Sequence, residues 1–189
     1  MAQFTVFLDA CVLYPAPLRD VLLELTVSNF FRAKWTAAVQ EEWIAALLRQ
    51  RSDLSREALV RTSEQMNRAV PDACVEGYAD LVGSLSLPDP KDRHVLAAAI
   101  KGRADMIVTL NLRDFPQPAL APWSIEAQHP DAFLANQFHL APARFLEVVK
   151  RVRARLKNPP KTVEEYLDTL RRQGLLATVA EIEPYHALI

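Results

Sequence analysis

The chain of 189 residues has little glycine, little cysteine and no long hydrophobic run. It contains only four glycines and no glycine-rich phosphate loop, which argues against a nucleotide-cofactor fold. The two cysteines, Cys11 and Cys74, are too few for a disulfide framework and fit a reducing cytosol. No apolar run reaches the roughly 18 residues that a transmembrane helix needs, and the first residues lack a signal-peptide pattern. We therefore expect a cytoplasmic protein that does not enter a membrane.

The composition is that of an ordinary folded protein. Hydrophobic residues make up 50% of the chain and charged residues 24%, so the chain can bury a full core. The net charge of −1 averages acidic against basic segments and does not by itself indicate a partner. The four histidines are scattered without the spacing of zinc ligands. Composition thus excludes several classes of protein without selecting one.

Short apolar runs predict a parallel sheet. Residues 3–9 and 105–110 are typical of strands covered on both faces, and residues 123–127 are expected to form a third strand. Helical periodicity or helix caps mark the segments 17–31, 36–50, 55–70 and 90–101, and the ambiguous residues 77–85 are interpreted as a short helix that leads into a loop. This order predicts an α/β fold, a three-layer α/β/α domain with a central parallel sheet.

The pattern beyond residue 130 is only helical. Helices are expected over residues 142–157, 162–174 and 175–182. Thr162 followed by Glu165 forms a capping box that opens the second of them. We therefore expect one domain over residues 1–130, followed by a helical C-terminal extension over residues 131–189.

Three acidic residues follow or open elements that end at the same edge of the predicted sheet. Asp9 and Asp114 follow the two buried strands, and Asp92 begins a helix that should start at that edge. Each alone could be a turn former or a helix cap. Carboxylates gathered there bind Mg²⁺ or Mn²⁺, which is the usual machinery for cutting phosphodiesters. Together they predict a metal-dependent nuclease.

Two further acids have simpler explanations. Asp89 suits the N-cap of the helix whose first residue is Pro90, a role that is complete without a metal. Glu42 lies beside Trp43 and borders the apolar face of its helix, from which it would reach the sheet edge. A solvated pair with Glu41 is the alternative.

Basic residues form two groups. Lys91, Arg93 and Arg113 flank the acids and are expected to hold the RNA backbone against a negatively charged site, whereas neighbouring His94 is interpreted as a surface or packing residue. The second group lies in the helical tail and consists of Lys150, Arg151, Arg153, Arg155, Lys157 and Lys161. It is either an RNA-backbone surface or the solvated face of a docked helix.

The motifs resemble those of PIN domains. Residues 9–13, 89–99 and 107–116 are similar to three of the family's acidic motifs, and Glu42 falls where the family places its helical glutamate. The resemblance covers roughly residues 3–130. It extends more loosely to the whole chain in VapC-type toxins, the ribonuclease halves of toxin–antitoxin pairs.

The resemblance implies a Mg²⁺- or Mn²⁺-dependent endoribonuclease that is the toxin of a type II pair. Its partners would be the RNA substrate and a cognate protein antitoxin, and a homodimer is left open. It implies that Asp9, Asp92 and Asp114 hold the metal and that Glu42 completes the catalytic acids. Thr109 would orient a carboxylate or the attacking water, and Asp89 would support the site.

Two positions depart from the family pattern. Cys11 stands where the family usually has Asn, Ser or Thr, and a thiol is a weaker hydrogen-bond donor. Asn111 stands where many members have Asp, so Asp114 would supply the carboxylate instead. The Asn111 amide would coordinate the metal or hold a water. The alternatives are an inactive PIN-fold module that binds RNA or a partner, and a phosphatase-like hydrolase. The latter needs a second acid at position 11.

Overall fold

The computed structural model describes residues 4–189 and divides the chain into two compact units. The first contains residues 4–14 and Phe31–His129, and the second contains Pro15–Phe30 and Pro130–Ile189. Residues 15–30 therefore fold with the C-terminal helices, although they lie within the expected N-terminal domain. The division into domains at residue 130 stays a prediction.

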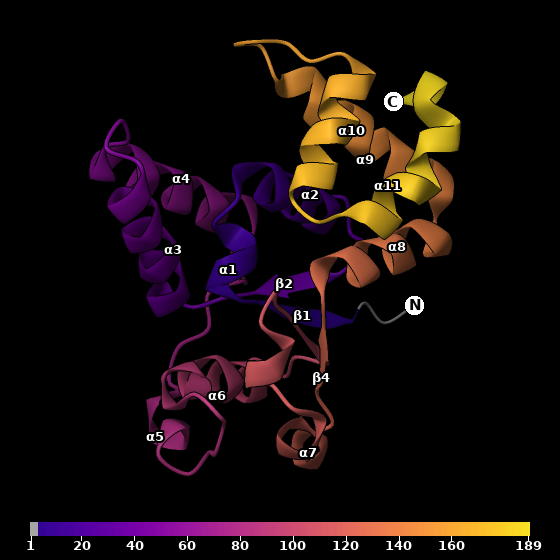
Figure 1. Ribbon diagram of the computed structural model, residues 1–189. Helices are drawn as coiled ribbons and strands as arrows, with labels where there is room; N and C mark the ends of the chain where they lie inside the picture. Colours follow the sequence, from indigo (N-terminus) through magenta and orange to yellow (C-terminus); the bar gives the residue numbers. More distant parts are fainter. Residues whose placement is uncertain (1–3) are drawn as a thin grey trace. The chain divides into compact units, whose positions relative to one another are not determined.

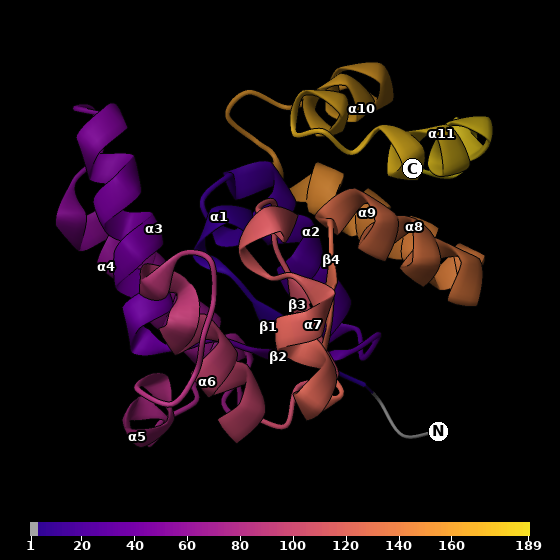
Figure 2. The ribbon, with the colours of Figure 1, turned by 60° about the horizontal axis from the view of Figure 1, so that its bottom comes forward.

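A four-stranded parallel sheet forms the centre of the first unit, with the strand order β2-β1-β3-β4 (Figure 2). The strands are β1 (Thr5–Leu8), β2 (Arg32–Lys34), β3 (Met106–Val108) and β4 (Glu126–Gln128). Leu8 pairs with Val108 in register, and both are fully buried. The residues after them, Asp9 and Thr109, consequently lie side by side at the carboxyl edge of the sheet. The predicted α/β fold with a central parallel sheet is confirmed.

Two details of the predicted strands are wrong. The helix expected over residues 17–31 ends at Val27, and β2 follows it unpredicted. Only Ala33 of the three β2 residues is fully buried, so this edge strand carries no apolar run that sequence analysis could detect. The third strand begins at Glu126 rather than at Trp123, because Trp123 belongs to a 3-10 turn and is 43% exposed.

The helices of the first unit are α1 (Ala10–Leu13), α3 (Ala37–Gln50), α4 (Arg56–Ala69), α5 (Ala79–Val82), α6 (Arg93–Lys101) and α7 (Gln117–Leu120). The side chains of Thr36 and Ser55 accept backbone hydrogen bonds at the starts of α3 and α4. In Figure 1, α6 lies below β1 and β2, and α1 lies above them. Helices thus cover both faces of the sheet.

The start of α6 brings Asp92 to the sheet edge. Asp89 accepts a hydrogen bond from Lys91 N at 2.9 Å, and a short 3-10 turn, Pro90–Asp92, precedes α6. The predicted cap at Asp89 is therefore confirmed. Gly102 follows the last residue of α6, as predicted, and a Cβ there would lie 2.9 Å from Val75 Cγ2. Glycine is needed at this position for close packing.

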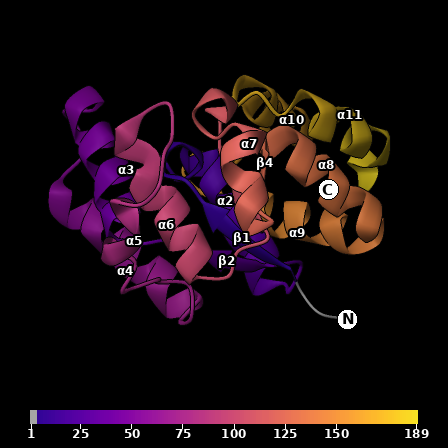
Figure 3. The ribbon, with the colours of Figure 1, turned by 90° about the horizontal axis from the view of Figure 1, so that it is seen from below.

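The second unit is entirely helical. Its helices are α2 (Ala16–Val27), α8 (Pro130–Leu140), α9 (Pro142–Arg155), α10 (Val163–Arg172) and α11 (Leu176–Ile182), followed by a 3-10 segment (Glu183–Leu188). Helix α8 packs beside α9 and α11 (Figure 3), and α2 packs against α9. The predicted capping box is present, with hydrogen bonds between Thr162 and Glu165 in both directions. The helical C-terminal region is confirmed.

Candidate active site

Asp9 is the most tightly held acid at the sheet edge. It is 7% exposed and follows β1 directly. Its Oδ2 accepts a hydrogen bond from Thr109 Oγ1 at 2.7 Å, and its Oδ1 accepts one from Ala10 N at 2.7 Å. Thr109, which follows β3, is fully buried. The two strands thus hold one carboxylate in a single orientation.

Cys11 strengthens this corner in spite of its departure from the family pattern. Its Sγ donates to Asp9 Oδ2 at 3.2 Å and accepts a hydrogen bond from Leu110 N at 3.2 Å. Burial, and then the charge of Asp9, raise the pKa of the thiol to about 12. The thiol therefore stays protonated at neutral pH and remains a donor to Asp9. The weaker ordering expected from a thiol is offset by these contacts.

Asp92 lies within the electrostatic reach of three other acids. Burial first, and then the negative charges of Asp9, Asp114 and Asp89, raise its pKa to about 6. Asp114 is half-buried at the end of a 3-10 turn, Leu112–Asp114. Carboxylates from the ends of β1 and β3 and from the start of α6 therefore repel one another in one place.

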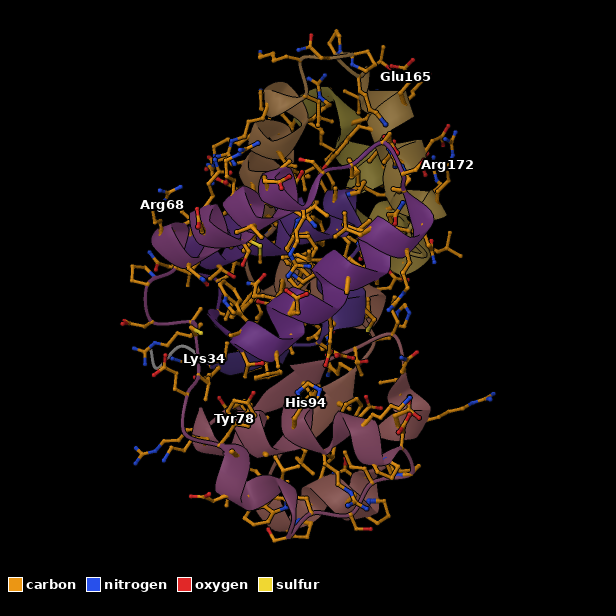
Figure 4. All side chains as sticks on the ribbon, turned by 90° about the vertical axis from the view of Figure 1, so that its left-hand side faces the viewer. Lys34, Arg68, Tyr78, His94, Glu165 and Arg172 are labelled. Carbon is orange, nitrogen blue, oxygen red and sulfur yellow. The ribbon has the colours of Figure 1, made fainter. Side chains whose placement is uncertain are left out.

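Glu42 has a different environment. It lies on α3, its side chain is 46% exposed, and its Oε1 is 2.9 Å from His94 Nε2. The hydrogen bond to Glu42 is the largest cause that raises the pKa of His94; burial lowers it, and the charges of Glu42, Asp9 and Asp92 raise it further. His94 is half-buried on α6 (Figure 4), and its ring interacts electrostatically with Glu42, Asp9 and Asp92.

The donor set fits a hard divalent cation. Within residues 4–189, no three acidic, histidine or cysteine side chains lie close enough together to enclose a metal ion. Mg²⁺ keeps several waters and needs only one or two carboxylates as direct ligands, so an enclosed site is not required. Burial and then the charges of neighbouring acids raise the pKa of Asp92, and a bound cation would favour its charged form. Asp9 and Asp92 would bind such an ion directly, and Asp114 would act on it through water.

The loop after β3 forms an open hollow beside these acids. Its volume is about 430 Å³, and residues 110–114 line it. Leu110 and Leu112 are 38% and 42% exposed there. Asn111 is exposed, and its backbone N–H donates to Thr109 Oγ1 at 3.0 Å. The Thr109 hydroxyl therefore hydrogen-bonds both the backbone of this loop and the Asp9 carboxylate.

The two groups of basic residues differ in their contacts. Lys91 and Arg113 are exposed, and Arg93 is half-buried, near the acids. In the second unit, Arg151 and Arg155 both bind Glu24 of α2 at 2.8 and 2.6 Å. Arg153 donates to the carbonyl oxygens of Lys161 and Ile189, whereas Lys150 is exposed. These contacts favour a docked helix, and RNA binding by this surface stays a prediction.

Comparison with known proteins supplies the family. Residues 5–113 match the family described as "PIN domain", which is more than half of the chain. The chain belongs to the PIN-domain family. The PIN-family match includes Asp9, Glu42 and Asp92 and ends one residue before Asp114. Residues 130–184 match the "VapC50 C-terminal domain".

One curated relative of this PIN protein comes from Mycobacterium tuberculosis (strain H37Rv) and is described as "Putative ribonuclease VapC50". The two are 43% identical over 97 residues, which cover 51% of this chain and 57% of the relative. The aligned part is thus less than two thirds of the relative. No solved structure gives a significant match. Among the described residues, no helix is long and apolar enough to cross a membrane.

Sequence reasoning missed two side-chain contacts with the site's acids. His94 was interpreted as a surface or packing residue, and the structure shows it as the hydrogen-bond partner of Glu42. Cys11 departs from the family pattern, yet it contacts both Asp9 and the loop after β3. No local pattern signals either contact, because each joins residues from different elements.

Proposed function

We propose that the protein is a Mg²⁺- or Mn²⁺-dependent endoribonuclease. The observation that carries this proposal is the gathering of Asp9, Asp114 and Asp89 around Asp92, where their negative charges add to burial in raising its pKa and only His94 acts against them. A bound divalent ion would lower the pKa of a water and stabilise charge on the scissile phosphate. Asp9, Asp92 and Asp114 hold the ion in this proposal, and Glu42 completes the catalytic acids.

The residues around the acids have distinct roles. Thr109 and Cys11 hold the Asp9 carboxylate in place through their hydrogen bonds. Asn111 borders the hollow and supports the loop, and Asp89 fixes the turn that carries Asp92. Lys91, Arg93 and Arg113 contact the RNA backbone and offset its repulsion by the acids.

We further propose that the protein is the toxin of a type II toxin–antitoxin pair. Support comes from the match of residues 130–184 to the C-terminal domain of VapC50 and from the relative's description as a ribonuclease. The partner would be a protein antitoxin that covers the acids. The compartment would be the cytoplasm, and a homodimer is compatible with this role.

Metal-dependent cleavage tests the enzymatic part of the proposal. The wild type, Asp9→Asn and Asp92→Asn are incubated with RNA and Mn²⁺, and RNA binding is measured in parallel. We expect cleavage by the wild type alone and RNA binding by all three. Asp80→Asn, at an exposed position on α5, is the matched control and should cleave normally.

The second candidate is a PIN-fold module that binds RNA or a protein without cleaving. One observation favours this alternative: among residues 4–189, no three potential ligand side chains lie close enough together to enclose a metal ion. This alternative predicts that the wild type binds RNA but cleaves none with Mn²⁺ or Mg²⁺. Such a result would overturn the enzyme proposal.

A further inference from the structure

A side-chain pair joins α6 to α3 at the margin of the carboxylate cluster. His94 Nε2 lies 2.9 Å from Glu42 Oε1, with the ring 19% exposed and the Glu42 side chain 46% exposed. Figure 4 shows His94 on α6 near α3. A glutamate this exposed would ordinarily sample several rotamers. The half-buried ring therefore determines where the Glu42 carboxylate points.

The ring has little other hydrogen bonding to orient it. His94 Nδ1 is buried and has no hydrogen-bond partner within the described part of the chain. A neutral ring with its proton on Nε2 avoids a buried, unpaired N–H at Nδ1. Nε2–H donates to Glu42 both in this neutral tautomer and when the ring is protonated. The contact therefore does not depend on the charge of His94.

We propose that His94 is a positioning residue that holds the Glu42 carboxylate toward the metal-binding acids. His94 lies two residues after Asp92 at the start of α6, and its ring also interacts electrostatically with Asp9 and Asp92, so the pair lies beside those acids. Glu42 then acts on the site through water, while Asp9 and Asp92 are the direct ligands. The inference rests on the proposed function, because it requires a divalent ion at the acids. Residues that orient such groups change metal affinity by about 10- to 100-fold when mutated.

Two neutral substitutions separate hydrogen bonding from charge. His94→Gln keeps an N–H donor, whereas His94→Leu keeps comparable bulk and has no donor. The dissociation constant for Mn²⁺ is measured on the full chain by electron paramagnetic resonance. We expect the Gln variant to bind Mn²⁺ about tenfold more tightly than the Leu variant. Equal affinities would overturn the proposal.

The role of Glu42 is tested by repeating this pair in a Glu42→Ala background. The difference between Gln and Leu should disappear there, because the group that His94 positions is absent. A difference that persists would show that His94 acts without Glu42 and would contradict the proposal. The same series is followed by kcat and KM, where the donor should restore kcat and leave KM unchanged.

A third variant covers the case in which a His94 substitution prevents folding. Glu42→Asp keeps the charge but is one methylene shorter, so it loses the 2.9 Å contact with Nε2. Since Glu42 is exposed, this variant should fold normally. We expect it to bind Mn²⁺ about tenfold more weakly than the wild type, and unchanged affinity would contradict the proposal.

The wild type distinguishes failure of this inference from failure of the proposed function. If it neither binds Mn²⁺ nor cleaves RNA, the nuclease proposal is wrong and the role of His94 falls with it. If it binds Mn²⁺ and cleaves RNA while the Gln and Leu variants are equal, only the positioning role is wrong.

Discussion

Two acids, Glu24 and Asp92, have opposite environments in the two units. Glu24 of α2 is 7% exposed, and it receives charged hydrogen bonds from Arg151 and Arg155. Burial raises the pKa of Glu24, but these hydrogen bonds and charges outweigh it, so the pKa is lowered. Asp92 has acidic neighbours instead, and its pKa is raised to about 6. Glu24 is thus an acid with two cationic partners, whereas Asp92 lies among other acids, where the proposed function places a metal ion.

The largest expected effect is the loss of RNA cleavage when Asp92 is substituted. Asp92→Asn should lower Mn²⁺-dependent RNA cleavage by more than about 100-fold, because it removes a proposed metal ligand. The midpoint temperature of thermal unfolding of the metal-free variant should not fall, because the substitution also removes the repulsion between Asp92 and its acidic neighbours. Cleavage within tenfold of the wild type would place catalysis elsewhere.

The compensated acid should show the reverse behaviour. Glu24→Gln should lower the free energy of unfolding by about 2 kcal/mol, because it removes charged hydrogen bonds from two arginines that are themselves largely solvated. Urea denaturation measures this loss, with the exposed Glu164→Gln as the control. Mn²⁺ binding should stay unchanged, and a lowered affinity would contradict the separation of roles.

A smaller effect is expected from the hydroxyl that holds Asp9. Thr109→Val keeps the shape of this fully buried residue and removes its 2.7 Å hydrogen bond to Asp9. We expect about tenfold slower cleavage and a loss of about 1 kcal/mol in stability. Single-turnover kinetics and urea denaturation measure the two quantities. A variant that is less stable but equally active would mean that Thr109 has only a structural role.

The pH dependence of stability should differ in sign between the two acids. The raised pKa of Asp92 means that the folded state binds more protons than the unfolded state between about pH 4 and 6, so its contribution to stability increases as pH falls through about 6. The lowered pKa of Glu24 means that its contribution is present at neutral pH and is lost in acid. Urea denaturation from about pH 3 to 7.5 measures both, because the contribution of Glu24 is lost only below its unfolded pKa. The loss of unfolding free energy as pH rises from 5 to 7 should be smaller in Asp92→Asn than in the wild type. The same pH profile in both proteins would contradict this assignment.

Sequence analysis predicted the features that local physics determines. The buried runs of β1 and β3, the caps at Ser55 and Asp89, and the capping box at Thr162 all depend on neighbouring residues. The same strands predicted that Asp9 and Asp114 lie near one edge. These features needed no knowledge of long-range packing.

The remaining features depend on contacts between distant parts of the chain. Strand β2 is too short and too exposed to produce an apolar run. Helix α2 folds with the C-terminal helices, and its Glu24 binds arginines more than a hundred residues away. The pair of Glu42 with His94 is another long-range contact that neither segment signals by itself. The sequence therefore predicted where the acids gather but not which of them have partners.

The proposed metal site is best tested by the pKa of Asp92, which carboxyl-carbon NMR follows with and without Mg²⁺. We expect a pKa of about 6 in the metal-free protein and a marked decrease when Mg²⁺ is added, because the cation stabilises the charged carboxylate. A pKa that is the same with saturating Mg²⁺ would contradict the claim that these acids form a divalent-metal site.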